Sequence, residues 1–145
     1  MNEKKCVHDY YSSWAQGNSL YMKWAAVHEI GYPELMVLYA LHMKGSVTQM
    51  KICDSYGFPK QTVNSVIRSF KAQGYIALTV NPSDKREKLV TLTDGGKAHS
   101  EKALGPLLEV EERVCKRIGE RKLCQMIETM ELFNLLFRKE MEREC

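Results

Sequence analysis

The 145-residue sequence contains no run of about 18 apolar residues and no apolar stretch near its first residues. A membrane-spanning helix needs the first feature and a secretory signal needs the second. We therefore expect a cytoplasmic protein that has no membrane-bound part.

Cysteine is too sparse and too irregularly spaced for two further classes of protein. The five cysteines are odd in number and form no C-x-x-C pair, which argues against a disulfide framework and against a zinc knuckle. The four histidines add no spacing that is typical of metal ligands. We expect neither a metal nor another cofactor.

Motifs that carry catalysis are also missing. The sequence has no glycine-rich phosphate loop, no nucleophile elbow and no H-E-x-x-H. The carboxylate pair Glu111 and Glu112 lies in a helical run of charges that is most simply solvated. We predict that the protein is not an enzyme.

The composition present is that of one globular domain, with 44% hydrophobic residues and a net charge of +3. The charge is uneven, because residues 44–97 carry nine Lys or Arg against four acids. Clustered cations favour an anionic partner such as a phosphate backbone, although a solvated basic face is the alternative.

Apolar spacing predicts helices over residues 8–29, between Gly31 and Gly45, and over 48–56, 60–73, 94–118 and 120–141. The turn Gly57-Phe58-Pro59 joins two of them, which is the helix-turn-helix pattern. The second helix of the pair has an apolar stripe that begins at Val63 and is expected to be buried, and its opposite face carries short polar side chains. An ordinary αα-hairpin would show the same pattern.

Two short alternating runs follow, around Ile76 to Val80 and Val90 to Leu92, and they predict a β-hairpin. The connection "NPSDKREK" combines turn residues with three cations. A hairpin tip with such charges can reach a DNA groove beside the one that a recognition helix occupies. Thr93, followed by Asp94, predicts the N-cap of the next helix.

The last helix has a large apolar stripe that includes Leu123, Ile127 and Phe137. One small domain cannot cover so much apolar surface, so association with a second copy is expected. The alternative is an intramolecular core.

These features resemble the MarR family of winged helix-turn-helix regulators, and the resemblance covers nearly the whole chain. Its most specific part is "GYIALTVNPSDKREKLVTLTDGGK", where a D-x-R wing tip precedes a Leu-Thr step into a glycine-containing helix start. Asp84 and Arg86 are similar to the family's wing acid and groove-inserting arginine. Lys85 and Leu78 stand where many members have arginine.

The resemblance implies a mainly α fold with a small β-hairpin wing. It divides the single domain 1–145 into a winged helix-turn-helix at 31–97 and dimerisation helices at 1–30 and 98–145. It also implies a homodimer that binds a pseudo-palindromic double-stranded DNA operator, usually as a repressor. The residues expected to contact DNA are Lys60, Gln61, Thr62, Asn64, Ser65, Arg68, Asp84, Lys85, Arg86 and Lys88.

Many members of the family release DNA when they bind a small hydrophobic ligand or meet an oxidant. Ligand-lining candidates in this sequence are the first-helix aromatics Tyr10, Tyr11, Trp14, Tyr21 and Trp24, which as an aromatic stripe also fit a core or an interface. Cys6 is the candidate redox thiol, because the family's peroxide sensors pair an early cysteine with tyrosines. The alternative function, from a different class, is a winged-helix module that binds a protein partner.

Overall fold

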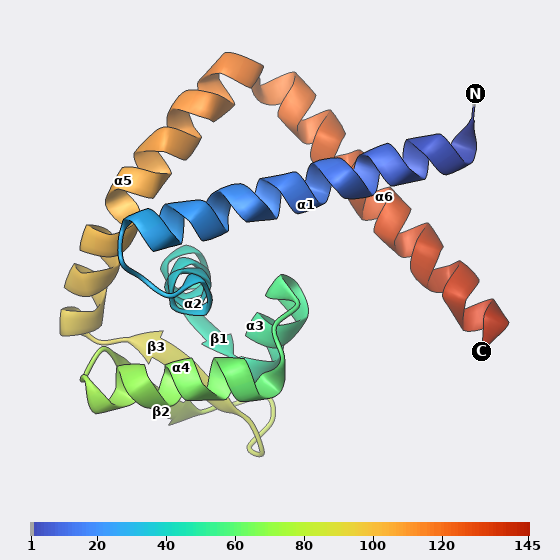
Figure 1. The fold of residues 1–145 in the computed structure, drawn as a ribbon. Helices are drawn as coiled ribbons and strands as arrows, with labels where there is room; N and C mark the ends of the chain where they lie inside the picture. Colours follow the sequence, from blue (N-terminus) through green and yellow to red (C-terminus); the bar gives the residue numbers. More distant parts are fainter. Residues whose placement is uncertain (1) are drawn as a thin grey trace. The chain divides into compact units, whose positions relative to one another are not determined.

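The structure is a computed structural model, and it describes residues 2–145. The helices of this range are α1 (Glu3–Val27), α2 (Tyr32–Lys44), α3 (Gln49–Tyr56), α4 (Lys60–Ala72), α5 (Asp94–Ile118) and α6 (Glu120–Glu144). The strands are β1 (Ser46–Thr48), β2 (Ile76–Val80) and β3 (Lys88–Leu92) (Figure 1). The predicted mainly helical fold with a small β-wing is confirmed.

The chain forms two compact units, Met1–Leu104 and Gly105–Cys145, with the boundary inside α5. The first unit holds the helix-turn-helix, the sheet and α1. The second holds the rest of α5, the break at Gly119 and α6. None of the helices in residues 2–145 is both long and apolar enough to cross a membrane.

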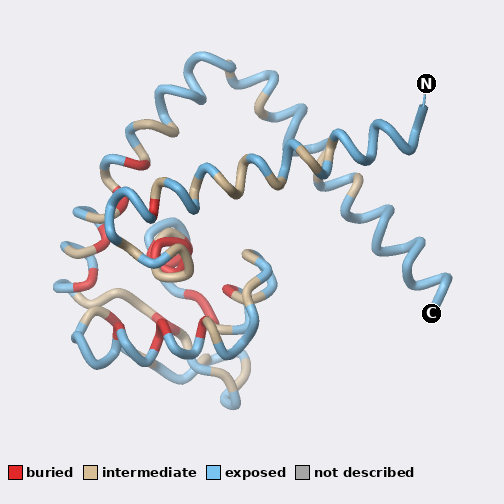
Figure 2. Tube along the Cα trace, viewed as in Figure 1, coloured by how far each residue is buried: buried red, intermediate tan, exposed pale blue. Residues whose placement is uncertain are grey.

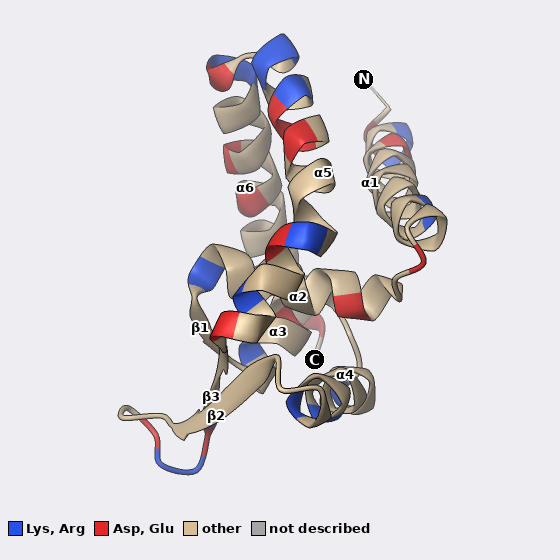
Figure 3. Cartoon of the chain, turned by 90° about the vertical axis from the view of Figure 1, so that its left-hand side faces the viewer, with Lys and Arg blue, Asp and Glu red and all other residues tan. Residues whose placement is uncertain are grey.

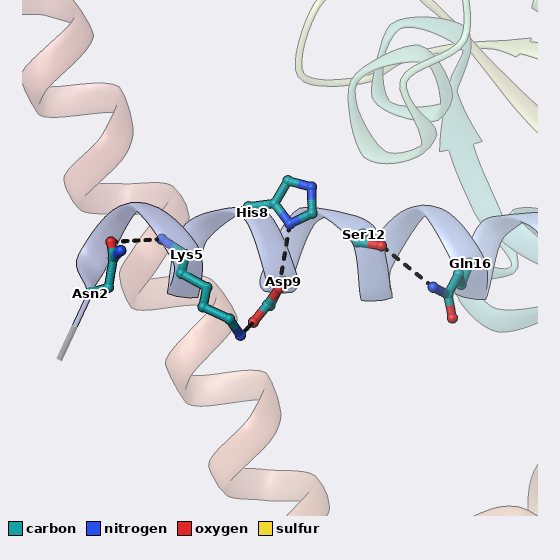
Figure 4. Close-up of polar contacts among 6 residues, drawn as sticks. All are labelled: Asn2, Lys5, His8, Asp9, Ser12 and Gln16. Carbon is teal, nitrogen blue, oxygen red and sulfur yellow. Dashed lines mark hydrogen bonds and ion pairs between the residues drawn. The ribbon is translucent and has the colours of Figure 1, made fainter.

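Helix α1 begins at Glu3, five residues before the start that apolar spacing predicts. Polar contacts account for the early start, as Figure 4 shows. The Asn2 side chain accepts a hydrogen bond from the Lys5 amide at 3.2 Å, and the Lys5 ammonium lies 2.7 Å from the Asp9 carboxylate one turn later. An N-cap and an i,i+4 ion pair each stabilise a helix end without any apolar residue.

The core of the first unit is built around α2, in which residues 35–38, 40 and 41 are buried (Figure 2). Leu35, Leu38 and Leu41 are no more than 1% exposed. Helix α2 contacts α4 and β3, and the α4 stripe that begins at Val63 is buried as its spacing predicts. The sequence-level apolar periodicity therefore locates the core correctly.

The sheet has three antiparallel strands in the order β1-β3-β2, one more than the predicted hairpin. Strand β1 pairs with β3 through Val47 opposite Val90. Thr48 ends this strand and caps α3, since its hydroxyl accepts a hydrogen bond from the Lys51 amide at 3.2 Å. Helix α3 consequently starts at Gln49 and not at Thr48.

The wing is anchored to the main body where β3 passes into α5. The Thr93 hydroxyl donates to the Gly74 carbonyl at 2.6 Å and accepts from the Gly96 amide at 3.0 Å, which confirms Thr93 as a cap of α5. A Cβ at Gly96 would lie 1.8 Å from the Tyr75 carbonyl oxygen. The second glycine of "TDGG" is therefore required by a close approach of two backbones.

Candidate nucleic-acid interface

Helix α4 presents a polar face opposite its buried stripe. The side chains of Gln61, Asn64, Ser65 and Arg68 are exposed, while Thr62 is half-buried. Within the described residues, Gln61, Asn64 and Arg68 have no hydrogen-bond or ion-pair partner among other side chains. These donors and acceptors are consequently available to a partner outside the chain.

The turn before α4 sets the position of that face. Gly57 ends α3 in a left-handed conformation with φ +68°, a backbone region that glycine enters without a Cβ clash. The Gln49 side chain donates from Nε2 to the Lys60 backbone carbonyl at 3.3 Å, which links the two helices of the motif. The Phe58 ring meets Tyr32 edge-on at 5.5 Å, so the turn is also packed against α2.

The wing loop, residues 81–87, is closed by local hydrogen bonds. The Asn81 amide donates to the Glu87 carbonyl at 3.1 Å, and the Asn81 side chain accepts from the Ser83 amide at 3.0 Å. The Glu87 amide donates to the Asp84 carbonyl at 3.0 Å. The loop is therefore a defined turn with Lys85 and Arg86 at its centre. Figure 3 shows this basic stretch flanked by acidic residues in the connection between β2 and β3.

Asp84 holds Arg86 by a two-pronged contact. Arg86 Nε donates to Asp84 Oδ1 and Arg86 Nη2 donates to Oδ2, both at 3.1 Å, and the Arg86 amide also donates to Oδ1 at 3.0 Å. These bonds lower the pKa of the Asp84 carboxyl and raise the pKa of the Arg86 guanidinium. The Arg86 side chain is still 90% exposed, so it is both oriented and accessible.

The predicted DNA-contact residues fall into two groups on one compact unit. Lys60 to Arg68 lie along α4, and Asp84 to Lys88 lie on the wing. Lys60, Lys85 and Lys88 are exposed, and none of them has an ion-pair partner within residues 2–145. Such an arrangement offers hydrogen-bonding side chains on a helix and unpaired cations beside it.

Sequence reasoning missed a cavity of about 410 Å³ between α3, the first residue of α4 and the wing. Met50, Cys53 and Leu78 line it together with cations of the candidate interface. No local pattern marks these residues, because they come from a helix and a strand that are distant in the sequence.

The five predicted ligand-lining aromatics all lie on α1. The Tyr11 and Trp14 rings are 5.7 Å apart, and the Trp24 ring stacks on His28 at 4.1 Å. Trp24 Nε1 is buried with no hydrogen-bond partner among the described residues. Cys6 is exposed on the same helix, one turn before Tyr10.

Helix α6 has no buried residue in the described chain. Its rings Phe133 and Phe137 stack at 5.9 Å. Large apolar side chains that are about half exposed on this helix are Met126, Ile127, Leu132, Leu135, Leu136, Phe137 and Met141. Of the stripe predicted for association, Met126, Ile127, Phe137 and Met141 are about half exposed, while Leu123 and Phe133 are partly buried.

Comparisons with known proteins agree with this architecture. The model of the MarR family matches residues 28–87. No curated protein matches the chain. The chain is similar to a solved structure of a MarR family regulator from Neisseria meningitidis, with a TM-score of 0.83, 24% identity and full coverage of both chains.

Two other solved structures are similar at lower identity. A MarR protein from Staphylococcus aureus, in complex with salicylate and kanamycin, has a TM-score of 0.66 and 18% identity over 95% of this chain and 93% of that one. A MarR transcriptional regulator from Methanosarcina mazei has a TM-score of 0.62 and 19% identity over 93% and 98% of the two chains. At these identities the likeness establishes the fold.

Proposed function

We propose, from the match of the MarR family model to the winged-helix region at residues 28–87, that the chain is a member of this family. In this proposal it is a homodimeric, sequence-specific regulator of transcription that binds double-stranded DNA. The observation that carries the proposal is the pairing of a polar, partner-free face on α4 with a cationic wing whose Arg86 is both oriented and 90% exposed. A protein that binds two adjacent grooves of DNA needs both the polar helix face and the cationic wing, whereas an enzyme has no need of this combination.

The two groups of residues have different roles in this proposal. Gln61, Asn64 and Arg68, with Thr62 and Ser65, read base edges in the major groove, where a good bidentate contact discriminates by about 1–3 kcal/mol. Arg86 enters the neighbouring minor groove, and Asp84 keeps its guanidinium aligned. Lys60, Lys85 and Lys88 bind phosphates and make the affinity dependent on salt.

The dimer is proposed from the exposed apolar residues of α6, together with the aromatics of α1. Seven large apolar side chains stay about half exposed on one helix, and burying them in an isologous contact removes that surface from water. Two recognition helices related by a two-fold axis address half-sites about 34 Å apart, which requires a pseudo-palindromic operator.

Repression with release by a ligand or an oxidant is the proposed mode of control. The buried and unpartnered Trp24 Nε1 supports a ligand site on α1, since a ligand acceptor would satisfy this donor. The structure from Staphylococcus aureus, whose chain holds salicylate and kanamycin, is a precedent for small-molecule binding on this fold. Cys6, exposed near Tyr10, is the proposed thiol for oxidant sensing.

The test is selection of bound sites from randomised duplex DNA by the full chain, read by sequencing at moderate salt. Enrichment of an inverted repeat with half-sites one helical turn apart is expected. Asn64→Ala should relax the selected motif at particular base pairs, and Arg86→Ala should weaken binding to every sequence and reduce the salt slope. Lys102→Ala, which removes an exposed cation of α5 outside the interface, is the matched control.

The outcomes separate this proposal from the rival protein-interaction module. No enriched motif, with equal behaviour of the Arg86→Ala and Lys102→Ala proteins on DNA, would favour the rival. Equal losses on selected and random DNA for both Asn64→Ala and Arg86→Ala would contradict the division of roles.

A further inference from the structure

Two side chains of α4 lie on the face directly opposite the core of the first unit. Val63 and Phe70 are 0% and 3% exposed, so they fix how the helix is rotated. Gln61 precedes Val63 by two residues. Arg68 likewise precedes Phe70 by two residues. Because a two-residue step along an α-helix turns by about 200°, Gln61 and Arg68 both lie on the outer face.

Both of these side chains keep their hydrogen-bonding groups available. Gln61 and Arg68 are exposed, and neither has a hydrogen-bond or ion-pair partner among other side chains of residues 2–145. The helix sequence "KQTVNSVIRSFKA" contains no aspartate or glutamate that could pair with the Arg68 guanidinium. The glutamine amide can both donate and accept hydrogen bonds, whereas the guanidinium can only donate them. The two groups are therefore available to different partners.

Each group matches one base in the major groove of DNA. A glutamine amide donates to N7 of adenine and accepts from its N6 amino group, while an arginine guanidinium donates to both N7 and O6 of guanine. Cytosine presents an amino donor that a carboxylate accepts, and α4 has no carboxylate. The outer face of α4 is therefore equipped to select the two purines.

The separation of the two side chains sets the spacing of the two bases. Seven residues of an α-helix rise by about 10 Å, and successive base pairs of B-DNA are about 3.4 Å apart. A recognition helix that lies along the major groove consequently brings Gln61 and Arg68 to base pairs three steps apart. Ser65 is exposed between them, and a serine hydroxyl does not select one base strongly.

We propose that each operator half-site contains an A·T pair read by Gln61 and a G·C pair read by Arg68, three base-pair steps apart. This inference rests on the proposed DNA-binding function, and it adds which bases the helix selects and at what distance. Arg86 belongs to the wing, so it contributes affinity without setting either of these two preferences.

The experiment compares the sites that the full chain and its variants select from randomised duplex DNA. Arg68→Gln replaces a guanine-reading group with an adenine-reading one, and Gln61→Arg makes the reverse exchange. We expect Arg68→Gln to convert one G·C pair of the wild-type motif to A·T. Gln61→Arg should convert an A·T pair three steps away to G·C. A residue with a merely structural role would weaken binding without changing the preferred base, and Arg86→Ala, the control, should leave both preferences unchanged.

A second measurement uses the wild-type chain and altered DNA. 7-Deazaguanine lacks the N7 acceptor, so at the predicted G·C pair it should weaken binding at least about fivefold. 7-Deazaadenine at the predicted A·T pair should cause a smaller loss, because the Gln61 amide is neutral. 7-Deazapurines at the two intervening pairs are the matched controls and should leave the affinity unchanged. In Arg68→Ala the loss caused by 7-deazaguanine should vanish, since the contact is already absent.

Three results would overturn the base assignment. They are an inverted repeat whose preferred bases stay the same in Arg68→Gln and Gln61→Arg, converted pairs that are not three steps apart, and equal losses for 7-deazapurines at the predicted and intervening pairs. Each of them leaves the proposed function intact, because the chain still selects an operator. A wild-type chain that enriches no motif would contradict the proposed function and the base assignment together.

Discussion

Alanine substitutions at the two adjacent glycines near the start of α5, Gly95 and Gly96, should change the free energy of unfolding in opposite directions. A Cβ at Gly96 would lie 1.8 Å from the Tyr75 carbonyl oxygen and 2.7 Å from its carbonyl carbon. Because both contacts are with backbone, relief requires moving α5 away from the turn that begins at Gly74. A Cβ at Gly95 would find its nearest atom, the Thr93 hydroxyl, at 3.8 Å, which is ordinary contact.

The magnitude for Gly96→Ala has two sources. Overpacking of a well-packed site costs about 1–3 kcal/mol. Movement of α5 also weakens the Thr93 cap, in which the hydroxyl accepts from the Gly96 amide at 3.0 Å, and the loss of a cap costs about 1 kcal/mol. We therefore expect the free energy of unfolding to fall by about 2–4 kcal/mol. Gly95→Ala should raise it by up to about 1 kcal/mol, because alanine is the better helix former.

The assay is urea unfolding of the full chain, followed by circular dichroism at one protein concentration so that association affects all samples equally. In a thermal scan, Gly96→Ala should lower the midpoint temperature of unfolding by more than about 4 °C, since 1 kcal/mol shifts this midpoint by about 2–4 °C in a chain of this size. A Gly96→Ala protein as stable as the wild type, or a Gly95→Ala protein that loses more stability, would refute the close approach of the two backbones.

Three further predictions concern the turn, the wing and the dimer. Gly57→Ala should reduce the free energy of unfolding by about 1–2 kcal/mol, because a φ of +68° is costly for alanine. The control is Gly17→Ala inside α1, where a Cβ would meet nothing within 4 Å, and this change should not destabilise the protein. Urea unfolding measures both variants. The depressed pKa of Asp84 means that its contact with Arg86 persists above the ordinary carboxyl value of 3.8 and is lost only as pH falls below it. The guanidinium signals of Arg86 in NMR should consequently stay constant from pH 8 to about pH 5, and a change within that window would contradict the two-pronged contact. Phe137→Glu, on the exposed stripe of α6, should shift the protein from dimer toward monomer in sedimentation, while Met43→Glu on α2 should not; equal effects of the two would contradict the proposed interface.

Local patterns predicted much of the candidate site. The α4 stripe at Val63 and Phe70 follows the helical period, so the opposite face that carries Asn64 was assigned from the sequence. Turn residues at the wing placed Arg86 near a loop tip, where it is found. The start of α1 was predicted too late, because a cap and an ion pair leave no apolar signal.

The sequence by itself determined the helices, the hairpin and the polar face of α4, because each follows from a period or a turn within a few residues of the chain. Only the tertiary structure decided the third strand, the need for glycine at position 96 and the cavity beside the wing. Strand β1 has three residues, too few to show the two-residue period of a strand, and it forms because Val47 pairs with Val90 of β3. Gly96 is required because its backbone lies close to that of Tyr75, and Met50 and Leu78 line the same cavity. Both features depend on where distant parts of the chain meet and not on any local preference.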